Sequence, residues 1–164
     1  MKLSAFAVML LLGSGLSPSA WSAPRGPSLS HWQKVELVEA YQYGGYRLAG
    51  IILQESSACK IVHSTIDPLA CGCGGVHVGT ADAMVGSDVS CAFMDIDWDF
   101  SIRVAELYLQ RCTELFGRAG GVTAYNVGIP KARTLTQYQL THSPYLRIIQ
   151  RRILELRALP LNTQ

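Results

Sequence analysis

The chain has 164 residues and a mass of 17.9 kDa, which is the size of one ordinary domain. Hydrophobic residues make up 49% of it and charged residues 16%, so it is too apolar for an intrinsically disordered protein. The formal net charge is only +2, whereas nucleic-acid-binding domains typically carry many clustered lysine and arginine residues. We therefore expect no nucleic-acid partner.

The first 22 residues have the pattern of a secretory signal peptide. Lys2 gives a positive start, an apolar run follows over residues 3–12, and small residues lead to a cleavage site after Ser22, in preference to Ala23. The run is shorter than the roughly 20 apolar residues that cross a bilayer, which favours removal over retention as a membrane anchor. We therefore expect an exported protein of the periplasm or cell envelope.

Helical patterns dominate residues 28–164, which we interpret as one domain. The pattern predicts helices over residues 31–43, 46–58, 99–116, 121–126 and 144–159. Ser30 is a suitable N-cap for the first helix, and Gly44 with Gly45 would end it. Gly117 is the expected end of the third helix.

A stretch rich in glycine and cysteine interrupts these helices. Between residues 61 and 89 the chain holds Pro68 and five glycines, which favours loops, and the β pattern around Val76 and Val78 is too brief to predict a sheet. The predicted fold class is therefore mainly α, a single compact helical domain with one Gly/Cys-rich excursion.

All five cysteines follow the signal peptide and would meet an oxidising compartment. They are Cys59, Cys71, Cys73, Cys91 and Cys112. An odd number leaves at least one thiol free or paired with another chain, and the spacing does not determine the connectivity. A zinc site is the alternative for Cys71 and Cys73 with His63 and His77, but neither C-x-x-C nor H-x-x-x-H spacing is present. We expect disulfides, no metal and no cofactor.

Glu55 is the candidate for acid/base chemistry. Leu48, Ile51, Ile52 and Glu55 fall at i, i+3, i+4 and i+7 of the second predicted helix, so the carboxyl group shares a face with aliphatic side chains. Desolvation on that face would raise its pKa and allow it to donate a proton near neutral pH. The alternative is that Glu55 lies at the edge of the stripe, in water near the helix end.

Two segments give the chain a family resemblance. Residues 52–57 read I-L-Q-E-S-S, and residues 122–128 read V-T-A-Y-N-V-G. Together they resemble the soluble lytic transglycosylases, which are lysozyme-like enzymes that cleave peptidoglycan. In that family a Q-E-S element carries the sole catalytic glutamate, a G-L-M-Q segment follows, and an A-Y-N-x-G element lies further on. The resemblance covers about residues 34–155.

The resemblance implies an α+β lysozyme-like fold with Glu55 as the catalytic acid/base. Ser56 would help to hold the glutamate, and a helix led by a tyrosine would close the domain. The implied substrate-binding residues are Ser56, Gly75, Val76, His77, Tyr125, Asn126 and Tyr145. Residues 75–78, G-V-H-V, stand where the family has G-L-M-Q, so the usual glutamine is missing. A cysteine-bearing insertion precedes them, and the sugar-binding wall must therefore differ.

The activity implied by the resemblance is that of a peptidoglycan lytic transglycosylase, a carbon–oxygen lyase. Protonated Glu55 would donate to the oxygen of the β-1,4 bond between N-acetylmuramic acid and N-acetylglucosamine. The resulting carboxylate would take the proton of the muramic acid 6-hydroxyl, which closes a 1,6-anhydro ring. The intramolecular nucleophile removes the need for the second carboxylate of ordinary glycosidases. The partners would be glycan strands and an envelope-spanning secretion, conjugation, pilus or phage machine.

Two other functions stay open at the level of sequence. A lysozyme-type hydrolase would need a second acid across the cleft from Glu55, for which Asp67, Asp82 and Asp88 are candidates. A non-catalytic peptidoglycan-binding or assembly protein would keep the fold without the chemistry, and the altered G-L-M-Q segment motivates this alternative.

Three further features have two interpretations each. The spacing of Asp95, Asp97 and Asp99 is that of a calcium-binding loop, but the segment lacks the glycine and the later glutamate of such a loop. Acidic residues at the start of a helix are the favoured interpretation. His77 either contacts sugar or is a bystander. The cations after residue 130 attract an acidic wall polymer or form a solvated helix face. They are Lys131, Arg133, Arg147, Arg151, Arg152 and Arg157, against Glu155 alone.

Overall fold

A computed structural model describes residues 28–63 and 67–159, and the predicted signal peptide lies outside these ranges. The described chain is mainly helical with one small antiparallel sheet, as predicted. Its elements are α1 (His31–Ser56), β1 (Ala70–Cys71), β2 (Val76–His77), α2 (Val78–Val85), α3 (Cys91–Ile96), α4 (Trp98–Val127), α5 (Ile129–Ala132), α6 (Gln137–Thr141) and α7 (Pro144–Arg157). None of the described helices is both long and apolar enough to cross a membrane.

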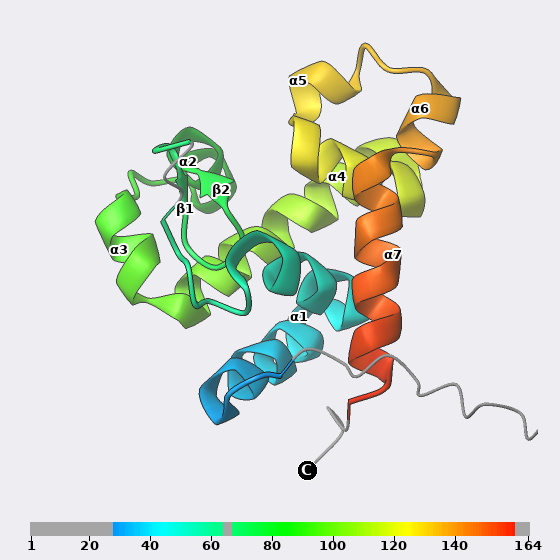
Figure 1. Cartoon of the computed structure of the whole chain (residues 1–164). Helices are drawn as coiled ribbons and strands as arrows, with labels where there is room; N and C mark the ends of the chain where they lie inside the picture. Colours follow the sequence, from blue (N-terminus) through cyan, green and yellow to red (C-terminus); the bar gives the residue numbers. More distant parts are fainter. Residues whose placement is uncertain (1–27, 64–66, 160–164) are drawn as a thin grey trace, which may run out of the picture.

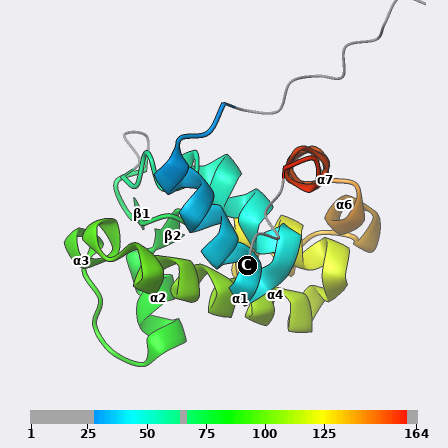
Figure 2. The same ribbon diagram turned by 90° about the horizontal axis from the view of Figure 1, so that it is seen from below.

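Helices α1 and α4 form the centre of the molecule, and the other elements lie on either side of them. The sheet, α2 and α3 gather on one side, whereas α5, α6 and α7 lie on the other (Figure 1). The view from below shows α1 lying over α4, with α7 seen end-on at the opposite side from α3 (Figure 2). Helix α7 packs against α1, and its contact region includes Gly50, where an added Cβ would lie only 3.4 Å from Ile153.

Helix α1 is continuous through Gly44 and bends at Gly45. The predicted break between two helices at these glycines is confirmed at Gly45, which leaves the helical conformation with φ of 65°. That left-handed value is accessible to glycine without steric cost, so the chain changes direction and resumes the helix. Ser30 caps the helix as expected, since its side chain accepts a hydrogen bond from the Gln33 N–H.

Helix α4 shows the same behaviour at Gly117, which was predicted to end a helix. Gly117 has φ of 73° and joins two helical halves into one element. The second half approaches the first closely, because a Cβ on Gly121 would lie 2.7 Å from the Thr113 Cα. Glycine at 121 is therefore required by packing, and the bend brings residues 122–126 back toward the core.

The core joins the two central helices to α7. Side chains with no exposed surface include Leu48, Ile51 and Ile52 of α1, Ile102 and Cys112 of α4, and Ile149 and Leu156 of α7. Each fully buried leucine or isoleucine stabilises the fold by roughly 1.5–3 kcal/mol relative to exposure. The aliphatic stripe that the sequence predicts around Glu55 is therefore the face that α1 buries.

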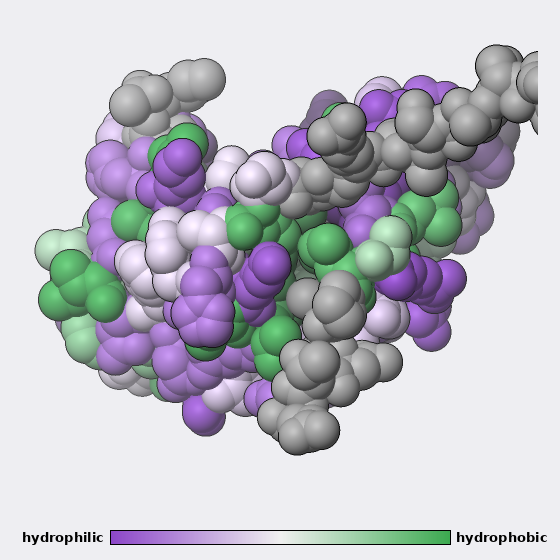
Figure 3. All heavy atoms as spheres, turned by 60° about the horizontal axis from the view of Figure 1, so that its bottom comes forward, coloured by the Kyte–Doolittle hydropathy of each residue, from purple (hydrophilic) through white to green (hydrophobic). Residues whose placement is uncertain are grey.

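The Gly/Cys-rich excursion contains more regular structure than the sequence predicts. Cys71 pairs with Val76 in the sheet, and α2 follows directly, so the expectation of loops was wrong over residues 78–85. Ser90 is the N-cap of helix α3, and its side chain accepts a hydrogen bond from the Phe93 N–H. Hydrophobic side chains of α3 remain exposed and form the left edge of the molecule in Figure 3.

Two disulfides hold the excursion. One joins Cys59 to Cys73, and the other joins Cys71 to Cys91, so disulfides form as predicted. Cys112 is the unpaired cysteine of the chain and is buried in α4. Burial raises the pKa of its thiol to about 11, which keeps it protonated and unreactive at neutral pH.

Candidate active site

Glu55 lies in the last turn of α1 and lines a cleft of about 860 Å³. One wall of the cleft comes from the Gly/Cys-rich excursion, and the other comes from the end of α4 and the start of α5. The wall residues from the excursion include Ile61, Val62, His63, Asp67, Gly75, Val76, His77 and Met84, and those from the other side include Tyr108, Tyr125, Asn126, Ile129 and Pro130. The size and the mixture of apolar and polar walls are typical of a ligand site.

The Glu55 carboxyl group is open to solvent through the cleft, yet enough protein surrounds it to raise its pKa. Burial is the larger influence, and a hydrogen bond from the Tyr145 hydroxyl to Oε1 opposes it. Tyr145 lies in the first turn of α7, and burial together with the nearby Glu55 charge raises its own pKa. The phenol therefore stays a hydrogen-bond donor to Oε1 of Glu55.

Gly74 and Gly75 form the wall that faces Glu55. A Cβ on Gly75 would lie 3.4 Å from Glu55 Oε2, and Gly75 has φ of +59°. A Cβ on Gly74 would meet the Ala105 Cβ at 2.5 Å and the Tyr125 hydroxyl at 2.6 Å. Gly74 is therefore required by its close approach to α4, and the positive φ of Gly75 favours glycine at that position. The resemblance places the altered G-L-M-Q segment here, and its first glycine contacts the predicted catalytic residue.

The A-Y-N segment contributes one buried and one exposed residue. Tyr125 is only 7% exposed, and its hydroxyl donates to the Gly74 carbonyl at 2.8 Å. Its ring packs on Tyr108 with the centroids 5.0 Å apart. Tyr125 therefore supports the glycine wall from behind, whereas Asn126 is exposed and offers its amide to the cleft. Tyr108 was not singled out from sequence, although it lies beside Leu109 of the predicted buried face.

Ser56 is buried and does not line the cleft, so the prediction that it binds substrate is not supported by its position. Its hydroxyl donates to the Ile52 carbonyl and accepts from the Cys59 N–H at 2.8 Å. Ser57, Ala58 and Cys59 all have left-handed φ values, from 54° to 60°. Such a backbone costs roughly 1–2 kcal/mol for each L-residue, and Ser56 helps to hold it.

The glutamine of Q-E-S ties α1 to α7. The Arg152 Nε–H donates to Gln54 Oε1 at 3.2 Å, and Arg152 also pairs with Glu155 at 2.9 Å. Tyr145 lies on the same helix as Arg152, so this contact fixes the element that delivers the phenol to Glu55. The remaining α7 cations differ in setting: Arg157 lies over the Tyr46 ring, while Arg147 and Arg151 are exposed, as expected for a solvated helix face.

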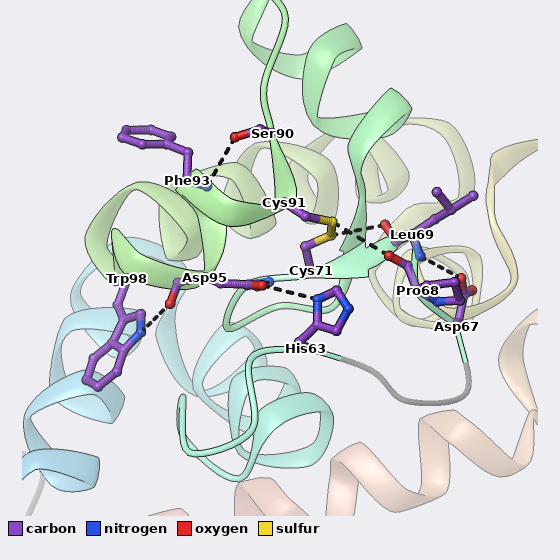
Figure 4. Close-up of polar contacts among 11 residues, drawn as sticks. His63, Asp67, Pro68, Leu69, Cys71, Ser90, Cys91, Phe93, Asp95 and Trp98 are labelled. Carbon is purple, nitrogen blue, oxygen red and sulfur yellow. Dashed lines mark hydrogen bonds and ion pairs between the residues drawn. A yellow bond between two sulfur atoms is a disulfide. The ribbon is translucent and has the colours of Figure 1, made fainter.

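Two histidine–aspartate pairs line the excursion wall. His77 Nε2 lies 2.7 Å from Asp67 Oδ2, and this bond lowers the pKa of the Asp67 carboxyl group. His77 therefore has a hydrogen-bond partner in Asp67, and both residues line the cleft. His63 Nδ1 lies 3.1 Å from Asp95 Oδ2, beside the Cys71–Cys91 disulfide (Figure 4). Spacing gave no signal for either pair, because the partners are 10 and 32 residues apart.

The other acidic residues of the excursion have structural roles. Asp82 accepts from the Val89 N–H at 2.7 Å, and Asp88 does not line the cleft. Asp97 caps α4 by accepting from the Phe100 N–H, and Asp99 lies in the first turn, as the helix-start interpretation predicted. Among the described residues, His63, Cys71 and Cys91 come close enough to share a metal ion. The two sulfurs are bonded to each other, and a disulfide offers no thiolate ligand.

No protein-family model, curated protein or solved structure matches the chain. The resemblance to lytic transglycosylases therefore remains a prediction that rests on the motifs. The structure describes where those motifs lie: Glu55, Gly75 and Asn126 come from three parts of the chain and line one cleft, whereas Gln54 binds Arg152 of α7.

Proposed function

We propose that this protein is a peptidoglycan lytic transglycosylase in which Glu55 is the sole acid/base. The proposal rests on the environment of Glu55, whose carboxyl group is open to the cleft and has a pKa that is raised by burial. The choice of peptidoglycan as the substrate rests on the sequence motifs, because the shape of the cleft alone does not distinguish this polymer from others.

The two carboxyl oxygens of Glu55 have different tasks in this proposal. Burial raises the pKa of Glu55 and so favours its protonated form, from which Oε2 donates to the glycosidic oxygen as the bond opens. The carboxylate formed then accepts the proton of the muramic acid 6-hydroxyl, which attacks the anomeric carbon. The Tyr145 hydroxyl bonds Oε1 throughout and stabilises the carboxylate between the two proton transfers. Asn126 and the apolar walls would hold the glycan strand in register.

A hydrolase is the second candidate, and Asp67 favours it. Of the three acids considered from sequence, Asp67 alone lines the cleft with Glu55. Its bond to His77 lowers its pKa and keeps it ionised, as a carboxylate that stabilises positive charge on a sugar must be. A third candidate, a non-catalytic binding protein, would bind sacculi without releasing any sugar.

Cleavage of sacculi in ¹⁸O-enriched water separates these functions. A transglycosylase closes the anhydro ring without water, so we expect products without the heavy isotope. The Asp67→Asn variant should then give the same product as the original protein. Incorporation of ¹⁸O at new reducing ends, lost in Asp67→Asn, would establish the hydrolase instead. Binding without any release by the folded protein would favour the non-catalytic role.

A further inference from the structure

The backbone directly after Glu55 is held in an unfavourable conformation. Ser57, Ala58 and Cys59 are three consecutive residues with a side chain and left-handed φ values, which L-residues rarely adopt in succession. Polar contacts hold the segment at its start: the Gln33 Nε2 amide donates to the Ser57 carbonyl at 2.7 Å, and Ser56 accepts from the Cys59 N–H. The left-handed segment therefore ends at Cys59, and hydrogen bonds to Gln33 and Ser56 hold this segment in place.

That cysteine is bonded to the wall that faces Glu55. Cys59 and Cys73 are 2% and 0% exposed, and their disulfide closes a loop between positions 14 residues apart. The Cys73 N–H donates to Ser101 Oγ at 3.1 Å, which fixes this end of the disulfide to α4. Gly74 and Gly75 follow immediately, and they are the residues that approach Tyr125 and Glu55.

The Cys71–Cys91 disulfide has a different setting. It joins the start of the sheet to α3, and Cys91 is only partly buried (Figure 4). It closes a loop of similar length, with positions 20 residues apart, but neither of its cysteines adjoins Glu55 in sequence or precedes the glycine wall directly. The molecule therefore contains one crosslink next to the candidate catalytic residue and a second that serves as a matched control.

We propose that the Cys59–Cys73 disulfide is a positioning crosslink that holds the Gly74–Gly75 wall against Glu55, so that the cleft is complete only when this bond is formed. The proposal rests on the proposed function for its consequence in catalysis. The proposal also states that the disulfide determines the environment of the Glu55 carboxyl group. This statement does not depend on which polymer is cleaved. Without the bond, the left-handed segment relaxes and the wall moves away, so that more of the Glu55 carboxyl group is surrounded by water.

The test compares Cys59→Ser/Cys73→Ser with Cys71→Ser/Cys91→Ser in the oxidised protein. The Glu55 carboxyl group is titrated by ¹³C NMR on glutamate-labelled protein, with Glu55→Gln to assign its signal. We expect the Glu55 midpoint to fall toward the ordinary value in the first variant and to stay unchanged in the second. Cleavage needs the protonated form, so the alkaline limb of the first variant's pH profile should move to lower pH. Its rate should fall on the order of a hundredfold, as expected for a displaced catalytic group.

An unchanged Glu55 titration in Cys59→Ser/Cys73→Ser, or an equal shift in both variants, would overturn the proposal. If the original protein cleaves no peptidoglycan, the proposed function fails while the titration still decides the positioning role. If the first variant does not fold, Gly75→Ala tests the same wall with both disulfides intact. Its methyl group would lie 3.4 Å from Glu55 Oε2 and should shift the Glu55 midpoint, whereas Gly79→Ala, with nothing within 4 Å, should not. No shift in Gly75→Ala would contradict the proposal.

Discussion

Helix α1 carries acidic residues of raised pKa in both of its halves, and their surroundings differ. Before the bend at Gly45, Glu39 has a pKa raised to about 7 by burial and by a hydrogen bond with Asp99. Asp99 also accepts from the Tyr43 hydroxyl at 2.7 Å and pairs with Arg103 at 3.0 Å. Beyond the bend, Glu55 is a single carboxyl group bonded by a tyrosine.

The difference shows that a raised pKa alone does not mark an active site. Glu39 shares its proton with a neighbouring carboxylate, and it does not line the cleft. Glu36 lies beside it with Oε2 buried and, among the described residues, without a hydrogen-bond partner. Glu55 combines the raised pKa with an open cleft and a close glycine wall, so its proton can reach a bound molecule. Four predictions separate the two ends of the helix.

The largest expected effect is that of Glu55→Gln compared with Glu39→Gln. Removing the only acid/base should lower peptidoglycan cleavage by about 10²–10⁴-fold or more, because amide nitrogen neither donates to the glycosidic oxygen nor accepts the hydroxyl proton. Glu39→Gln should cleave at the original rate. Release of soluble muropeptides from sacculi measures both, and equal losses in the two variants would contradict the distinction.

Tyr145→Phe tests the hydrogen bond that Glu55 has and Glu39 lacks. The bond lowers the Glu55 pKa, so its loss should raise the titration midpoint further. Cleavage should fall by roughly ten- to hundredfold, since a hydrogen bond to a charged group contributes about 1.5–3 kcal/mol. A ¹³C titration and the rate of muropeptide release give the two values. A lower midpoint for Glu55 in this variant would refute the assigned role of the phenol.

Gly74→Ala tests the glycine wall, which lies beside Glu55 at the C-terminal end of α1. The added methyl group would lie 2.5 Å from the Ala105 Cβ and 2.6 Å from the Tyr125 hydroxyl, so either the wall or α4 must move. Overpacking of this kind costs about 1–3 kcal/mol of unfolding free energy. Denaturant unfolding should show this loss, while Gly79→Ala stays close to the original stability. Equal stabilities of the two variants would mean that the wall is not tightly packed.

The smallest expected effect is the contribution of Glu39 to the pH dependence of protein stability. The folded-state pKa of about 7 lies above the ordinary 4.5, so the folded protein binds a proton that the unfolded chain releases. This contribution to stability is fully present below about pH 4.5 and is lost as the pH rises through about 7. Thermal unfolding between pH 5 and 8 should therefore show a falling midpoint whose slope is reduced in Glu39→Gln. The same slope in both proteins would show that Glu39 does not titrate in this range.

Local sequence signals predicted those features that depend on a single helix face. The buried stripe of Leu48, Ile51 and Ile52 predicted the orientation of α1, and the Ser30 and Asp97 caps follow from local chemistry of the same kind. The helical conformation is interrupted at Gly45 and Gly117, as the glycine signals predicted. The sequence did not predict that a second helical segment would follow directly at each bend, because that depends on packing between distant segments.

Contacts between residues that are far apart in the chain could not be predicted from local sequence patterns. The bond from Tyr145 to Glu55 joins residues 90 positions apart, and that from Tyr125 to Gly74 joins residues 51 apart. The motifs placed these tyrosines near the cleft without assigning a partner to either. The disulfide connectivity was equally open, because five cysteines in one excursion and two helices fit many pairings.

The central claim is that one carboxyl group performs the whole reaction, and product analysis tests it most directly. Purified sacculi are digested with the oxidised protein and with Glu55→Gln, and the released sugars are identified by mass spectrometry. The account predicts products that end in 1,6-anhydromuramic acid and that disappear with Glu55→Gln. The same anhydro products from Glu55→Gln at the original rate would contradict it.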